Sequence, residues 1–125
     1  MIVRVLYPRD SKHLAKGFET RDYVVPREVL VSFFDEYRRS RNFARAVDVI
    51  CGYVAGLAAE EWCRAVGAGR RDDCIVGYLD KQGERIREQC EVAVRAWVVH
   101  TAECLRQCGR DFSCFEKCYY ESSGG

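Results

Sequence analysis

Eight cysteines are the residues of this chain whose type and spacing best suit covalent chemistry. Four of them form a twin motif, Cys104-x₃-Cys108 and Cys114-x₃-Cys118, on either side of Gly109. Residues four apart share one face of a helix, so two helices folded back at Gly109 would bring these sulfurs together. Facing residues of an antiparallel hairpin have a constant sum of residue numbers. This rule predicts the disulfides Cys104–Cys118 and Cys108–Cys114.

The other four cysteines supply an independent test, because any symmetrical twin motif satisfies that rule. Around the glycine-rich turn at residues 67–69, the same rule pairs Cys63 with Cys74 and Cys51 with Cys90, with an offset of four residues between the two pairs. An irregularity in the second helix of this hairpin would absorb the offset. The cysteines therefore predict four disulfides that staple two antiparallel hairpins.

Two other interpretations of the cysteines remain open. Four convergent thiolates would suit a structural zinc ion, and His100, one turn before Cys104, offers a further ligand. Zinc ligands usually begin with two intervening residues on a knuckle, whereas these cysteines have helical spacing, which favours disulfides. Buried free cysteines, acting as small apolar side chains, are the third interpretation. The preferred interpretation requires no metal and no cofactor.

The sequence carries no catalytic signature. It has no phosphate-binding loop, dinucleotide fingerprint, nucleophile elbow or two-histidine metal motif. His13 and His100 stand alone, and solvation and helix capping explain the acidic pairs at 60–61 and 72–73. A thiol catalyst needs a base beside its cysteine, and no local pattern provides one. We therefore expect a protein that is not an enzyme.

Basic residues are concentrated at the start of the chain. Residues 1–45 hold ten basic and six acidic residues, a net of +4, and the remainder holds ten and thirteen, a net of −3. The ten basic residues are Arg4, Arg9, Lys12, Lys16, Arg21, Arg27, Arg38, Arg39, Arg41 and Arg45. This pattern predicts contact with the phosphate backbone of a nucleic acid, without base readout. The alternative for residues 38–45 is a solvated helix end, where arginines complement the negative end of the helix dipole.

These residues must be positioned by a single domain, since the chain has 125 residues. Only two prolines leave room for long helices and disfavour a turn-rich β-sandwich. Residues 1–25 predict an extended N-terminal arm with short β-strands near its two ends. Residues 26–121 predict an all-α, disulfide-stapled helical bundle of antiparallel hairpins, and residues 122–125 predict a flexible tail.

Apolar residues at helical spacing set the expected helices of the bundle. Ser40 is the expected cap of the second helix, and Asp111 or the capping box at 113–116 begins the last one. Gly83 is the expected site of a kink or break, because glycine costs about 1 kcal/mol within a helix. The expected helices cover residues 26–39, 40–66, 72–109 and 111–120.

The first residues lack the apolar core of a secretory signal, and the longest uncharged run, residues 49–59, is shorter than a membrane span. We therefore expect no membrane span and no secretion by the usual route. Disulfides are rare in the cytosol, but hyperthermophile proteins and virions are exceptions. The 16 arginines against 4 lysines, with few Asn, Gln and Met, favour a hyperthermophile.

The arm up to Pro26, the basic cluster Arg38-Arg39-Ser40-Arg41 and the helical seams that follow resemble the coat proteins of filamentous viruses of hyperthermophilic archaea. In that group, extended N-terminal arms and helical bundles wrap double-stranded DNA. The resemblance implies a self-assembling coat protein of the virion, whose partners are copies of itself and DNA held by the ten basic residues. The alternative is a small disulfide- or zinc-stabilised helical interaction or regulatory module in the cytoplasm of a hyperthermophilic archaeon.

Overall fold

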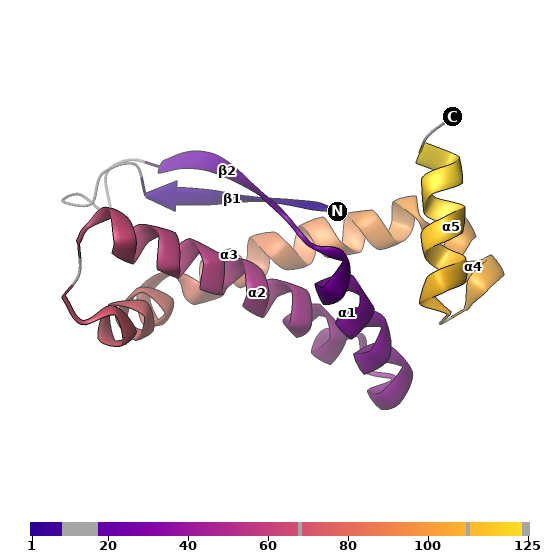
Figure 1. Cartoon of the computed structure of the whole chain (residues 1–125), viewed down its shortest axis with the longest axis horizontal. Coiled ribbons are helices and arrows are strands. Elements are labelled where there is room, and N and C mark those ends of the chain that lie inside the picture. The colour runs from indigo at the N-terminus through magenta and orange to yellow at the C-terminus, as the bar shows by residue number, and fades with distance from the viewer. Residues whose placement is uncertain (9–17, 68, 110, 124–125) are drawn as a thin grey trace.

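The structure of the protein is a computed structural model that describes residues 1–8, 18–67, 69–109 and 111–123 (Figure 1). A two-stranded sheet precedes a set of helices that make up most of the chain, so the predicted all-α class is confirmed. The elements are β1 (Ile2–Pro8), β2 (Phe18–Val24), α1 (Arg27–Ser40), α2 (Phe43–Ala65), α3 (Arg71–His100), α4 (Ala102–Cys108) and α5 (Phe112–Ser123). Helix α5 extends two residues into the segment predicted as a tail.

Of the first 25 residues, the described ones, 1–8 and 18–25, fold back onto the bundle. Strands β1 and β2 pair in antiparallel register, with Val3 opposite Tyr23 and Val5 opposite Arg21. Alternate residues point to opposite faces of a strand, and Val3, Val5 and Val25 are buried in the core. The strands lie along α2 and α3 (Figure 1). The predicted short strands are confirmed, and burial of Val3 and Val5 of β1 and of Val25 just after β2 packs the hairpin against the helices.

Helices α2 and α3 form the central antiparallel hairpin (Figure 1). Ile50 and Val54 of α2 and Ile86 and Val94 of α3 are fully buried between them. The uncharged run at residues 49–59 of α2 is buried or half-buried at every position except Gly52, so protein covers this part of the helix on nearly all sides. Among the described residues, no helix has both the length and the apolar character that a bilayer crossing requires.

All eight cysteines form disulfides in the predicted pairing. Cys51–Cys90 and Cys63–Cys74 join α2 to α3, and Cys104–Cys118 and Cys108–Cys114 join α4 to α5. The Cα–Cα distances are 5.6, 6.0, 5.7 and 5.4 Å, within the range of ordinary disulfides. Because no cysteine is free, the thiolates of the zinc interpretation do not exist in this structure.

The prediction of a break at Gly83 is wrong. Helix α3 runs from Arg71 to His100 through this glycine, because burial of Tyr78 and Ile86 on the flanking turns outweighs its propensity cost. The break occurs instead at Thr101, which separates α3 from α4. The Thr101 hydroxyl donates a hydrogen bond to the carbonyl of Trp97 at 2.8 Å, a local bond that competes with helix continuation.

Two helix starts show how the chain reverses direction. Asn42, not Ser40, caps α2: its side-chain oxygen accepts a hydrogen bond from the Arg45 backbone N–H at 3.3 Å. Asp111 caps α5 in the same way, accepting from the Cys114 N–H at 3.3 Å, which confirms the first of the two predicted starts. A side-chain acceptor at this position satisfies backbone donors that the first turn leaves without partners.

Removal of Cys51–Cys90 should destabilise the protein more than removal of Cys108–Cys114. The two bridges span 39 and 6 residues along the chain, so the chain-entropy model gives losses of about 4 and about 2 kcal/mol. Chemical denaturation of the Cys51→Ala/Cys90→Ala and Cys108→Ala/Cys114→Ala variants measures both losses. Equal losses would show that loop closure does not govern the stability of this fold.

Replacing Gly83 with alanine should stabilise the protein by about 0.5–1 kcal/mol, because alanine restricts the unfolded chain and favours the helix. An added Cβ would meet Leu79 Cβ at 3.7 Å, an ordinary packing contact. Gly67→Ala is the matched control: Gly67 has a φ of +67°, so the same change there should destabilise. Urea unfolding measures both, and a loss of stability in Gly83→Ala would contradict the packing seen at this turn.

Candidate functional site

The arginine of β1 that was predicted to bind nucleic acid is held within the hairpin. Arg4 lies directly opposite Asp22 in the strand register. Its Nε donates to Asp22 Oδ1 at 2.7 Å and its Nη2 donates to Oδ2 at 3.2 Å, a two-point ion pair. The hydrogen bond from Arg4 lowers the pKa of the Asp22 carboxyl. A phosphate would have to displace this carboxylate in order to reach Arg4.

Two further predicted arginines also have carboxylate partners. Arg21 forms an ion pair with Glu61 on α2. Arg27 Nε lies 2.6 Å from Glu116 Oε2 on α5, and its guanidinium stacks over the Phe112 ring at 5.2 Å. The Arg21 pair links the β-hairpin to α2, and the Arg27 pair links α1 to α5. Both pairs lower the positive charge of this surface. Three other predicted binding residues, Arg9, Lys12 and Lys16, lie outside the described residues.

The remaining predicted arginines lie together where α1 passes into α2. We call Arg38, Arg39, Arg41 and Arg45 the basic turn; all four side chains are exposed. Arg41 has a left-handed φ of 55°, which ends α1 and reverses the chain. Asp35, which is exposed, and Glu36, which is largely buried, partly neutralise the turn through ion pairs whose arginine ends are exposed. Ion pairs between exposed groups are weak, typically about 0–1 kcal/mol. The basic turn is therefore the part of the predicted interface that the structure brings together and leaves accessible.

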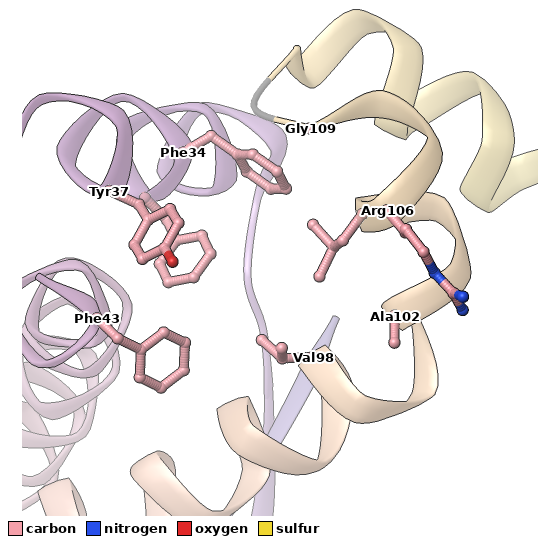
Figure 2. Close-up of a pocket in the computed structure, with 9 residues that line it drawn as sticks. Phe34, Tyr37, Phe43, Val98, Ala102, Arg106 and Gly109 are labelled. Atoms are coloured by element: carbon pink, nitrogen blue, oxygen red, sulfur yellow. The ribbon is translucent and has the colours of Figure 1, made fainter. Parts of the chain in front are cut away.

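An open groove lies beside the basic turn, between the α1–α2 connection and the junction of α3 with α4 (Figure 2). Its volume is about 460 Å³. Aromatic side chains from α1 and α2 form one wall, and aliphatic side chains from α3 and α4 form the other (Figure 2). We call it the aromatic groove; its lining residues are Phe33, Phe34, Tyr37, Phe43, Val98, Ala102, Leu105, Arg106 and Gly109.

Edge-to-face contacts hold the aromatic wall. The ring centroid of Phe33 lies 5.5 Å from that of Phe34 and 6.3 Å from that of Phe43, and Tyr37 lies 6.4 Å from Phe43. Phe33 and Phe34 are only 5% and 4% exposed, whereas Tyr37 is 37% exposed. The aromatic wall is therefore part of the packed core, and the Tyr37 ring lies at its boundary with solvent. Such a surface binds apolar groups with little rearrangement.

The groove offers little for bond-making chemistry. Among the described residues that line it, Arg106 alone is charged; its guanidinium points away from the groove (Figure 2) and pairs with Glu103 on the same helix. No His, Asp or Glu is among the lining residues of this groove. Within the described parts of the chain, no three such residues or cysteines cluster as ligands for a metal ion. The arrangement suits binding by shape and apolar contact.

The sequence did not predict this groove, although it placed most of its aromatic residues correctly. Phe33, Phe34 and Tyr37 fall within the helix predicted at residues 26–39, and Phe43 falls within the next predicted helix. A detectable signal was the flanking of the basic cluster by Tyr37 and Phe43, which keeps large rings close to exposed charge. The opposite wall comes from residues 98–109, which lie far away in the sequence.

Comparisons with protein-family models, curated proteins and solved structures find no match to this chain. The aromatic groove and the basic turn are therefore interpreted from their own chemistry.

Replacing Arg4 with glutamine should raise the pKa of Asp22 toward its ordinary value, because the lowered pKa depends on the Arg4 hydrogen bond. With a lowered pKa in the folded state, the pair stabilises the fold above the unfolded-state pKa and loses that effect as the pH falls through the folded-state value. An NMR titration of the carboxyl measures the shift. Arg64→Gln, on α2, is the control, and an unchanged Asp22 pKa in Arg4→Gln would mean that the pair does not form in solution.

Proposed function

We propose that the protein is a non-enzymatic, disulfide-stapled helical module that binds another polypeptide in the aromatic groove. The observation that carries this proposal is an open apolar groove of about 460 Å³ in a small protein. Binding sites are typically concave and apolar, with volumes of about 300–1,000 Å³. A cleft with helical walls is also a common way to recognise the apolar face of a partner helix.

The disulfides support this function because they hold both walls of the groove in place. Cys104 and Cys108 flank Leu105 on the α4 wall, and their bridges to α5 fix this helix. The opposite wall is anchored in the core by Phe33 and Phe34. A site that is already in its binding geometry loses less conformational entropy when the partner arrives. Covalent stapling thus favours binding over a catalytic cycle that needs moving lids.

A coat protein that assembles around double-stranded DNA in a virion is the second candidate function. Its support is the basic turn, whose four exposed arginines lie at the end of α1, in the α1–α2 connection and at the start of α2. Exposed Val92 and Val99 on α3 offer apolar surface for contact between copies. The ion pairs of Arg4, Arg21 and Arg27 weigh against it to a limited degree, because they partly neutralise three of the basic residues on which the DNA contact was predicted.

A fluorescently labelled peptide probes the groove directly. The peptide is neutral and amphipathic, is about four helical turns long, and carries leucines at i, i+3/i+4 and i+7 spacing. Tyr37→Asp places a charge at the groove boundary and should weaken binding about tenfold or more, as loss of a contact at an interface centre does. Fluorescence anisotropy measures the Kd, with Val76→Asp, an equally drastic change at an exposed α3 valine, as the control.

Circular dichroism verifies that both variants are folded. Equal binding by Tyr37→Asp and the unchanged protein, or no binding by either, would contradict the proposal. The coat protein would be favoured instead if the protein bound a short DNA duplex tightly, if Tyr37→Asp left that affinity unchanged, and if added salt lowered the affinity steeply.

A further inference from the structure

We infer that the polypeptide bound by the aromatic groove is an acidic amphipathic helix, whose carboxylates contact Arg38 and Arg41 at one end of the groove. This inference rests on the proposed function and specifies the chemistry of the partner. Its apolar side chains would fill the groove, and its acidic side chains would meet the basic turn.

One arginine of the basic turn, Arg38, continues the face of α1 that carries Phe34, and a second, Arg41, lies just past the end of this helix. Arg38 follows Phe34 by four residues, and Arg41 follows Tyr37 by four. Residues four apart share one face of a helix. The Arg41 backbone N–H also bonds to the Tyr37 carbonyl at 2.8 Å, which places Arg41 one turn beyond Tyr37. A partner helix that lies along the groove and reaches the end of α1 would therefore come close to Arg38 and Arg41.

The charge around the groove is positive after the local ion pairs are taken into account. These pairs are Arg38 with Asp35, Arg39 and Arg45 with Glu36, Arg95 with Glu91, and Arg106 with Glu103. In the described parts of the chain, Arg41 has no ion pair, and two arginines share Glu36. One positive charge is therefore left unbalanced at Arg41 and one is shared by Arg39 and Arg45 beside the largely buried Glu36, while Arg38 has only an exposed pair with Asp35. The described residues that line the groove include no carboxylate. This field attracts acidic partners and disfavours basic ones.

The geometry favours a polypeptide over a nucleic acid. Bases of a single strand stack on exposed aromatic faces, but Phe33 and Phe34 are buried and their rings meet other rings at their edges. A duplex has phosphates for the basic turn, yet it has no apolar side chains for the groove. An amphipathic helix satisfies both surfaces, because anchors at i, i+3/i+4 and i+7 lie on one face and acids on its border.

Three peptides test the inference on the full chain. They have equal length and the same leucine anchors, and they carry Glu, Gln or Lys at the flanking positions. We expect the Glu peptide to bind about tenfold more tightly than the Lys peptide in low salt, with the Gln peptide between them. The preference should shrink in about 0.5 M NaCl, where charges are screened over a few ångströms. Fluorescence anisotropy measures the three Kd values.

Charge reversal locates the contact. Arg38→Glu/Arg41→Glu should invert the preference, so that the Lys peptide binds best. Arg39→Glu/Arg45→Glu is the matched control, since it makes the same change of charge in the same turn, on the side that faces Glu36. It should weaken Glu-peptide binding only mildly, without inversion. Circular dichroism and the Gln peptide, whose affinity should stay within about twofold, verify that each variant retains the groove.

The outcomes separate this inference from the proposed function. Binding of all three peptides with equal affinity, all weakened by Tyr37→Asp, would overturn the acidic partner and leave the groove as a polypeptide site. Equal effects of the two charge reversals would also overturn it, because the charge would then act only as a diffuse field. Failure of every peptide to bind would overturn the proposed function, and DNA binding lost only on reversal of Arg38 and Arg41 would assign the turn to nucleic acid.

Discussion

The covalent bond between Cys51 and Cys90 is the interaction from which the other parts of the molecule take their positions. It joins the middle of α2 to the middle of α3, and its two residues are 2% and 0% exposed. Fully buried side chains surround it, so the bridge and the apolar core favour the same helix pairing. In the unfolded chain this bond also restricts the 39-residue separation between its ends, which lowers the entropy that folding must overcome.

The other elements are built outward from this pair of helices. The β-hairpin places Val3 and Val5 against it, and α1 adds Phe33 and Phe34. The C-terminal hairpin, α4 with α5, packs through Phe115, whose ring lies 4.9 Å from that of Phe34 and 5.3 Å from that of Trp97. Phe115 thus connects the last helix to both the first helix and the central pair. The two terminal disulfides then fix α4, and with it one wall of the groove.

The distribution of charge shows how acidic partners neutralise part of the basic N-terminal third of the chain. The described arginines of the hairpin and the start of α1 pair with acids that come from β2, α2 and α5. These pairs link elements that are distant in sequence. Among the described basic residues of this segment, the unbalanced charge lies in the basic turn, next to the aromatic groove. Function is therefore expected where the two surfaces meet.

Much of this architecture was determined locally by the sequence. Helical periodicity and cysteine spacing depend on residues within a few turns of one another, so they predicted the helical bundle, the cap at Asp111 and all four disulfide pairs. Tertiary packing decided the rest. Gly83 stays helical because buried neighbours outweigh its propensity, Arg4 is occupied by Asp22 across the hairpin, and the groove exists only because residues 33–43 meet residues 98–109. A local pattern cannot specify such contacts, since their free energy comes from surfaces that face one another only after the chain has folded.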